Sequence, residues 1–144
     1  MILDVIGSSD YHKIVSKQVK EIISFLTKES IEFGITSNVQ AVRFSPELPS
    51  VIKSKLSPFP MFMLANYSFE SLKLYDDYLE FEAGFGKENF GSVVNIPYLA
   101  IFQIVLDESI LYLNPVATQT SLFENLSSVL KSKTKLKLAS KNNG

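Results

Sequence analysis

The sequence predicts a small α+β fold, mainly β, in which an N-terminal amphipathic helix packs on a strongly bent sheet. Two observations support this prediction. Apolar residues recur at spacings of three and four near the start of the chain, and they alternate with polar residues in several later segments. The 144 residues suit one domain with a substantial core, and an apolar fraction of 46% argues against a disordered chain.

The helix is predicted over Asp10–Ser30, in a segment that ends near Gly34. Ser8, Ser9 and Asp10 can each accept a hydrogen bond from the free amides of a first helical turn. An apolar stripe follows, made of Val15, Val19, Ile22, Ile23 and Leu26. His12 lies in the first turn, and we interpret it as a solvated or helix-packing residue, because one histidine cannot build a metal site alone.

Two strands are predicted before the centre of the chain. Ile35–Phe44 is rich in β-branched residues and predicts the first strand. Phe59–Ala65 is an almost continuous apolar run, which predicts a buried strand with both faces covered. The prolines between them indicate a loop or a short helical turn, because proline lacks the amide donor that a central strand needs.

The central segment from Ser71 to Asn95 predicts an antiparallel meander. Its first two strands show a period of two, and Asp76-Asp77 between them suits a tight turn. Glycines punctuate the end of the second strand and the connection to a third strand, Ser92–Ile96. This glycine-spaced region is the most distinctive part of the sequence.

The remaining elements complete one domain over residues 1–115. Pro97 begins a short apolar turn or helix, Tyr98–Val105, and Ile110–Leu113 is the last predicted strand. Residues 116–144 are predicted to be a short helix followed by a mobile basic tail. One helix and five short strands indicate a small bent barrel of the Sm-like or SH3-like kind.

No constellation of catalytic residues is apparent. The chain has no cysteine, which excludes disulfides and thiol nucleophiles. Glu80 and Glu82 share one face of a strand, and a solvated face explains them better than acid–base catalysis. Asp76-Asp77 offers too few oxygen ligands for a metal site. We therefore expect a binding protein rather than an enzyme, with no cofactor and no metal.

The charge distribution separates the tail from the body. Five lysines and one acid give the segment from Pro115 onward a net charge of +4, so the rest carries −5 within a total of −1. Because Met1–Gly7 is too short for a signal peptide or a membrane span, we expect a soluble cytoplasmic protein. An Sm-like nucleic-acid binder or another interaction module is the alternative function, although the acidic body argues against RNA.

Four segments in the right order resemble the core of the stringent starvation protein B family. They are Phe62-Met63-Leu64-Ala65, Leu72-Lys73-Leu74, the run from Asp77 to Gly86 that contains Phe81-Glu82-Ala83-Gly84-Phe85-Gly86, and Val93-Val94-Asn95-Ile96-Pro97-Tyr98-Leu99-Ala100-Ile101. The similarity covers roughly Tyr11 to Pro115. It implies an Sm-like barrel that binds ssrA-type tag peptides and delivers tagged substrates to the ClpX unfoldase of the ClpXP protease.

The resemblance also implies roles for particular residues. The tag-binding groove would include Ser68, Phe69, Glu82, Ala83, Gly84 and Phe85, and Gly84 stands where the family has an arginine that helps to hold the tag. The leading helix would form a homodimer with Val15, Val19 and Ile22 at or near the interface. Within the tail, Leu136 and Leu138 would dock on ClpX.

Overall fold

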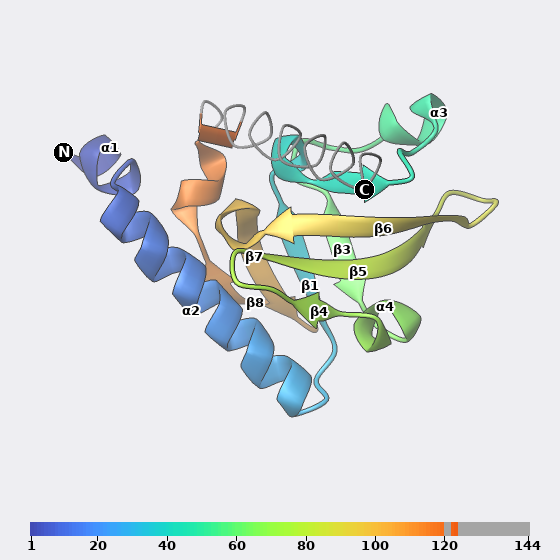
Figure 1. Cartoon of the computed structure of the whole chain (residues 1–144), viewed down its shortest axis with the longest axis horizontal. Helices are drawn as coiled ribbons and strands as arrows, with labels where there is room; N and C mark the ends of the chain where they lie inside the picture. Colours follow the sequence, from blue (N-terminus) through green and yellow to red (C-terminus); the bar gives the residue numbers. More distant parts are fainter. Residues whose placement is uncertain (120–121, 124–144) are drawn as a thin grey trace, which may run out of the picture.

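Helix α2 (Ser9–Lys28) runs along one side of two four-stranded antiparallel sheets (Figure 1). The structure is a computed structural model that describes residues 1–119 and 122–123. Ser8 caps the helix by accepting a hydrogen bond from the Tyr11 amide at 3.4 Å. The short helix α1 (Ile2–Ile6) precedes α2, and His12 Nε2 lies 2.5 Å from the Ile6 carbonyl oxygen. His12 therefore ties the two helices together.

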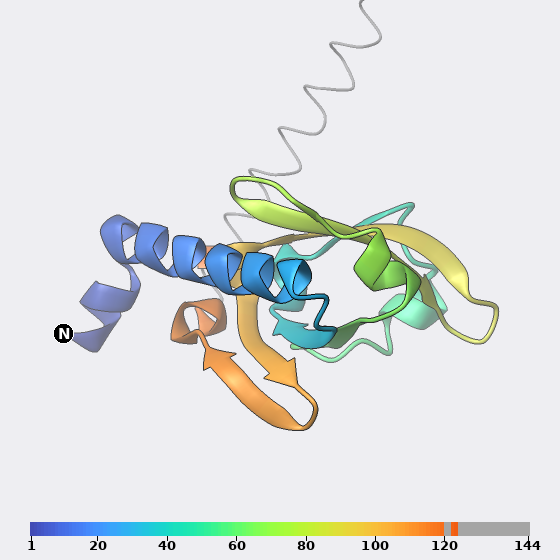
Figure 2. The same ribbon diagram turned by 90° about the horizontal axis from the view of Figure 1, so that it is seen from below.

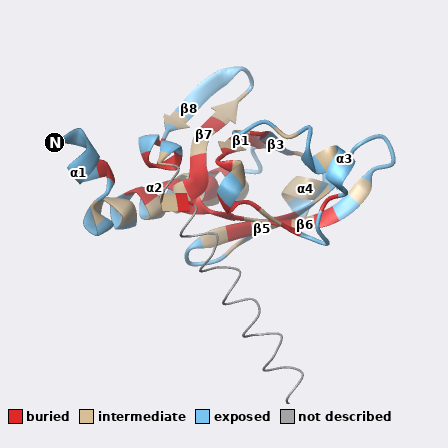
Figure 3. Ribbon diagram, turned by 90° about the horizontal axis from the view of Figure 1, so that it is seen from above, coloured by how far each residue is buried: buried red, intermediate tan, exposed pale blue. Residues whose placement is uncertain are grey.

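The first sheet has the strand order β3-β1-β7-β8. Its strands are β1 (Phe33–Ser37), β3 (Met61–Leu64), β7 (Ile101–Leu106) and β8 (Ser109–Leu113). Ile35 of β1 pairs with Phe62 on one side and with Ile104 on the other, so all three side chains face the core. The β7–β8 hairpin projects away from the body, and β8 is the exposed edge of this sheet (Figures 2 and 3).

The second sheet has the strand order β2-β6-β5-β4. Its strands are β2 (Arg43–Ser45), β4 (Lys73–Leu74), β5 (Tyr78–Phe85) and β6 (Phe90–Pro97). Strands β5 and β6 pair along their whole length, from Tyr78 opposite Pro97 to Phe85 opposite Phe90. Residues 86–89 form the turn of this hairpin, and both Gly86 and Asn89 have positive φ. The predicted meander of β4, β5 and β6 is thus confirmed.

Short helical segments connect the strands. They are the α-helical turns α3 (Ser50–Lys53) and α4 (Tyr67–Glu70) and the 3-10 helices η1 (Val39–Ala41), η2 (Tyr98–Ala100) and η3 (Pro115–Thr118). Helix α4 lies beside strand β5 in both ribbon views (Figures 1 and 2). It forms one wall of the site described below.

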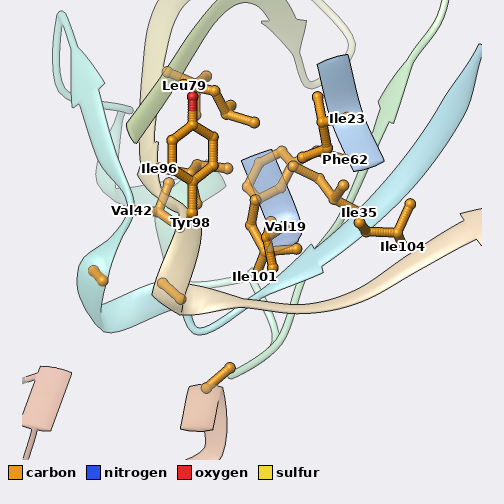
Figure 4. Close-up of a cluster of buried hydrophobic side chains, with 14 of the residues drawn as sticks. Val19, Ile23, Ile35, Val42, Phe62, Leu79, Ile96, Tyr98, Ile101 and Ile104 are labelled. Atoms are coloured by element: carbon orange, nitrogen blue, oxygen red, sulfur yellow. The ribbon is translucent and has the colours of Figure 1, made fainter. Parts of the chain in front are cut away.

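The core lies between the inner faces of the two sheets and is covered by α2 (Figure 4). Phe62 of the first sheet meets Phe81 of the second with ring centroids 5.9 Å apart in an edge-to-face arrangement. Val19 and Ile23 of α2 are fully buried and close this core from the side. Each such side chain contributes about 1.5–3 kcal/mol by leaving water.

The core continues beyond Pro115, where the sequence analysis ended the domain. Val116, Ala117 and Phe123 are fully buried. Two asparagine side chains hold this end of the chain. Asn38 Nδ2 donates to the Ala117 carbonyl at 2.9 Å, and Asn114 Nδ2 donates to the carbonyls of Leu99 and Ile101 at 2.9 and 3.0 Å. The described residues that follow Pro115 therefore contribute to the core, and the predicted division of the chain at residue 115 stays a prediction.

Several predicted elements differ from those observed. Helix α2 ends at Lys28, and Gly34 belongs to β1. The predicted strand Ile35–Phe44 is two strands in different sheets, because the Asn38 side chain accepts a hydrogen bond from the Gln40 amide and turns the chain at η1. The predicted turn or helix Tyr98–Val105 is η2 followed by strand β7.

Two further expectations are corrected by the packing. Strand β3 is covered on one face only, since Met61 and Met63 are exposed while Phe62 and Leu64 are buried. Over the described residues the strands form two separate sheets rather than a closed barrel. The α+β class with mainly strands and an N-terminal helix is confirmed.

Candidate functional site

The outer face of the second sheet carries the polar side chains of β5. Glu80, Glu82 and Gly84 alternate with the buried Leu79 and Phe81, as the period of two predicts. In the β5–β6 register, Glu80 lies opposite Asn95, Glu82 opposite Val93, and Gly84 opposite Gly91. The last of these rows has no side chains, so the sheet surface there is bare backbone.

A hollow of about 550 Å³ lies over this part of the face. It is lined by Ser45, Pro46, Ala65, Asn66, Tyr67, Ser68, Glu82, Ala83, Gly84, Asn89, Gly91, Ser92 and Val93. A second hollow of about 570 Å³ adjoins it along β5 toward Lys73 and Glu80, and the two share Tyr67, Glu82 and Val93. We call these two adjoining hollows beside α4 the groove.

One edge of β5 faces the groove. Pairing between β4 and β5 ends at Lys73 and Glu80. Beyond it, the Glu82 carbonyl accepts a hydrogen bond from Ser68 Oγ at 2.8 Å, and the Glu82 amide donates to Ser71 Oγ at 2.9 Å. The Glu82 backbone groups therefore point toward α4.

The same geometry opens the edge at Gly84. Because backbone groups in a strand alternate between its two sides, the N–H and C=O of Gly84 point the same way as those of Glu82. Among the described residues, β5 pairs with β4 and β6 alone, and neither reaches this side of Gly84. The strand thus presents an edge to which an extended chain could bind.

Asn89 covers the space above Gly84. A Cβ atom built on Gly84 would lie 1.7 Å from Asn89 Oδ1, so a side chain at position 84 and the present Asn89 conformation exclude each other. Across the hairpin, a Cβ on Gly91 would meet nothing within 4 Å. The groove floor therefore consists of open backbone at Gly91 and an amide group over Gly84.

Carboxylates make the groove acidic. Glu70, Glu80 and Glu82 line it, and Lys73 is the basic residue of its lining among the described residues. Tyr67 donates its hydroxyl proton to the Glu82 carboxylate, and Tyr75 Oη donates to Glu80 Oε2 at 3.3 Å. Each tyrosine holds one carboxylate in place.

These contacts also act on the tyrosines. The pKa of Tyr67 is raised, first by its hydrogen bond to Glu82 and then by the negative charge of Glu82. The charge of Glu80 is the main cause of the raised pKa of Tyr75. Both hydroxyls therefore remain protonated donors at neutral pH.

Asn66 positions α4 against the groove. Its φ of 53° and ψ of −125° form a combination that usually requires glycine, and such a conformation costs about 1–3 kcal/mol. The Glu32 carboxylate accepts a hydrogen bond from the Asn66 amide at 2.5 Å, which helps to hold this turn. Tyr67 follows directly, and the turn directs it toward Glu82.

The structure brings four of the six predicted groove residues together. Ser68, Glu82, Ala83 and Gly84 line the hollow. Phe69 and Phe85 do not, because Phe69 packs edge-on against Phe33 and Phe85 packs edge-on against Phe44. The two rings thus pack away from the hollow, and their predicted part in peptide binding stays a prediction.

Some lining residues were missed from the sequence. Asn66 and Tyr67 directly follow the predicted strand Phe59–Ala65, and polar residues at the end of a strand are a usable signal. Asn89 and Gly91 depend on the β5–β6 register, which places Gly91 directly opposite Gly84. That register could have been predicted from the turn between the two strands.

The leading helix presents different residues from those predicted for a dimer. Val15 and Val19 are 2% and 0% exposed within a single chain, so they belong to the chain's own core. Their predicted place at or near a dimer interface stays a prediction. Ile22 is half-buried and borders a surface hollow with Phe25 and Leu111. Phe25 is 58% exposed and lies on the surface that a second copy could reach.

The remaining sequence assignments concern features outside this groove. Leu136 and Leu138 lie outside the described residues. Within the described part of the chain, no cluster of three or more His, Asp or Glu side chains could hold a metal ion, and no helix has the length and apolarity needed to cross a membrane. Neither a scan against models of known protein families nor a search of curated proteins finds a match for this chain.

Proposed function

We propose that the protein is a proteolysis adaptor that binds ssrA-type tag peptides in the groove and delivers tagged substrates to ClpXP. The open edge of β5 at Gly84 is the observation that carries this proposal. We further propose that the two-sheet arrangement is an open variant of an Sm-like fold, as the resemblance to the stringent starvation protein B family implies.

The groove suits an extended peptide. Backbone hydrogen bonds to a strand edge supply affinity that depends little on sequence, and neighbouring side chains supply selectivity. Ser68 and Ser71 already satisfy the backbone groups of Glu82, so new strand pairing would begin at Gly84. The open space over Gly91 leaves room beside this edge for the side chains of a bound peptide. The groove carboxylates would repel nucleic-acid phosphates, which favours a peptide ligand.

Filling the groove from Gly91 tests this proposal. Gly91→Trp adds a large side chain in open space, so it should block a peptide without displacing other groups. We expect at least a tenfold loss of affinity in a fluorescence anisotropy titration with labelled ssrA-type peptides. Gly91→Ala is the matched control and should bind within about twofold of the parent. A folded Gly91→Trp protein with parental affinity would place the peptide elsewhere.

Delivery requires a second contact, with the unfoldase. A weakly held tag reaches a high local concentration when its adaptor is tethered to the enzyme. We propose that the C-terminal segment makes this contact through Leu136 and Leu138. Replacing both leucines with serine should leave tag affinity unchanged and abolish the adaptor's acceleration of degradation by ClpXP. Unchanged acceleration would locate the contact elsewhere.

We also propose that the protein forms a homodimer through the exposed side of α2. Ile22, Phe25 and Leu111 provide a contiguous apolar surface there. Phe25→Asp should convert the dimer to a monomer in sedimentation at tens of micromolar, because it places a charge in an apolar contact. Met63→Asp, on a different exposed apolar surface, is the control and should leave the dimer intact. A parent that sediments as a monomer would refute the dimer.

A further inference from the structure

We propose that the groove of each chain binds the lysine-rich C-terminal segment of that same chain, residues 131–137, which a tag must displace. This inference rests on the proposed function, because the segment would compete with the tag for the groove. Three observations identify this segment as the occupant of the groove: its charge, the spacing of its lysines and the length of chain available.

The groove carboxylates have a regular spacing. Glu80 and Glu82 project from one face of β5, two residues apart, which separates them by about 7 Å along the strand. Tyr75 and Tyr67 hold these two carboxylates through hydrogen bonds. The acidic pair is therefore placed before any ligand arrives.

The C-terminal segment has the same spacing in its sequence. Lysine occupies positions 131, 133, 135 and 137, with serine, threonine or leucine between them. An extended segment of this kind presents its ammonium groups on one face with the same repeat of about 7 Å. Two successive lysines therefore match the spacing of the Glu80 and Glu82 carboxylates. The segment's charge complements a body that is acidic overall.

The available chain is long enough to reach the groove. Phe123 is anchored in the core, and the twelve residues from 124 to 135 could span about 40 Å when extended. A domain of this size has a radius of gyration of about 13 Å. The extended span is about three times this radius, and short tethers give effective concentrations in the millimolar range.

Removing the lysines should therefore release the groove. We expect that Lys133→Gln/Lys135→Gln/Lys137→Gln binds tags about three- to tenfold more tightly than the parent. A control with three exposed lysines of α2 replaced, Lys13→Gln/Lys17→Gln/Lys28→Gln, makes the same charge change on a remote surface. Its tag affinity should stay within about twofold of the parent.

Paramagnetic broadening tests the contact directly in the full chain. The chain has no cysteine, so Ser140→Cys gives a single attachment point for a nitroxide. At low salt the amide signals of Gly84 and Gly91 should broaden, and they should recover at 0.5 M salt and in the triple-lysine variant. Absence of broadening at low salt would overturn the inference. So would broadening that persists in Glu80→Gln/Glu82→Gln.

A mixed sample identifies the source of the segment. When nitroxide-labelled chains without ¹⁵N are mixed with ¹⁵N-labelled chains that carry no nitroxide, binding within one chain predicts no broadening. Broadening in this sample would mean that the segment comes from another copy, which would overturn the inference. Tag binding by a parent that shows no broadening would refute this inference and leave the adaptor function standing. Broadening in a parent that binds no tag would refute the adaptor function instead.

Discussion

Both sheets are four-stranded and antiparallel, but their outer faces carry different kinds of side chain. The second sheet exposes carboxylates, small polar groups and a hollow beside an open strand edge. The first sheet exposes two rows of residues that include no charge: Met63, Gly34, Val105 and Ile110 in one, and Met61, Thr36, Gln103 and Leu113 in the other. The outer face of the second sheet can offer directional bonds to a ligand, whereas that of the first sheet offers mainly non-directional apolar contact.

The glycines show how this difference arises. A Cβ on Gly34 would lie 2.8 Å from the sulfur atoms of both Met61 and Met63, so the side chains of these two methionines cover that glycine. A Cβ on Gly91 would meet nothing. Glycine thus allows close side-chain packing over the first sheet at Gly34, and it leaves the backbone of the second sheet accessible at Gly91. Whether a bare position becomes a site depends on its cross-strand neighbours.

The largest expected effect concerns Gly84, where the resembling family has an arginine. Gly84→Arg together with Asn89→Gly should strengthen binding of acidic tags by about tenfold or more, because a hydrogen bond to a charged group contributes about 1.5–3 kcal/mol. Gly84→Arg alone should gain less, since Asn89 occupies the required space. Anisotropy titrations of both variants and of Asn89→Gly measure this. An equal gain from the single variant would contradict the covering role of Asn89.

Two variants with the same change in net charge, one on the outer face of each sheet, test which face sets the tag preference. Glu80→Gln/Glu82→Gln and Met61→Lys/Met63→Lys each raise the net charge by two. The first should reduce the preference for neutral over acidic tags about three- to tenfold, because exposed ion pairs contribute about 0.2–1 kcal/mol each. The second should leave that preference unchanged. Equal responses would show that only the overall charge matters.

A single methyl group should distinguish the two glycine environments. Gly34→Ala should lower the free energy of unfolding by about 1 kcal/mol, because the thioethers of Met61 and Met63 must move. Gly91→Ala should leave it unchanged or raise it by about 0.5 kcal/mol, since alanine restricts the unfolded chain. Urea unfolding measures both values. Destabilisation by Gly91→Ala would mean that the groove floor is not open.

Alkaline pH should act on stability through Tyr98 of η2. Tyr98 donates its hydroxyl to the Tyr75 carbonyl at 2.6 Å, and burial is the main cause of its raised pKa. Because the folded-state pKa exceeds the unfolded value near 10, this stabilisation is complete below pH 10 and is lost as the pH rises above it. Tyr98→Phe should cost about 1 kcal/mol at pH 8.

Urea unfolding at pH 8 and pH 11 tests the same point. The destabilisation between these values should be smaller in Tyr98→Phe than in the parent, because phenylalanine has no proton to lose. An identical loss in both proteins would show that folding does not raise the pKa of Tyr98.

The sequence predicted what local periodicity determines. Alternation along β5 correctly placed Glu80, Glu82 and Gly84 on one face, because backbone geometry imposes a period of two. The same alternation puts Ala83 on the inner side with Phe81, so its backbone rather than its side chain borders the groove. The short helix α4 was missed, because four residues are too few to show a helical period.

Long-range contacts could not be predicted in this way. Asn38 and Ala117 are 79 residues apart, and their hydrogen bond ties residues beyond Pro115 to the fold. The position of the Asn89 side chain over Gly84 depends on the exact geometry of the turn at residues 86–89. Val15 and Val19 appeared available for a dimer because an apolar stripe does not reveal which surface covers it.

The anchoring of residues 114–117 and of Phe123 has a mechanical consequence. A pull applied at residue 124 would act first on Phe123, and then on the bonds that Asn38 and Asn114 make to η3, η2 and β7. These bonds link the end of the fold to β1 and β7, the two central strands of the first sheet. Force along the tail would therefore load the middle of that sheet, while the groove sheet and its bound ligand would lie outside the direct path of the load.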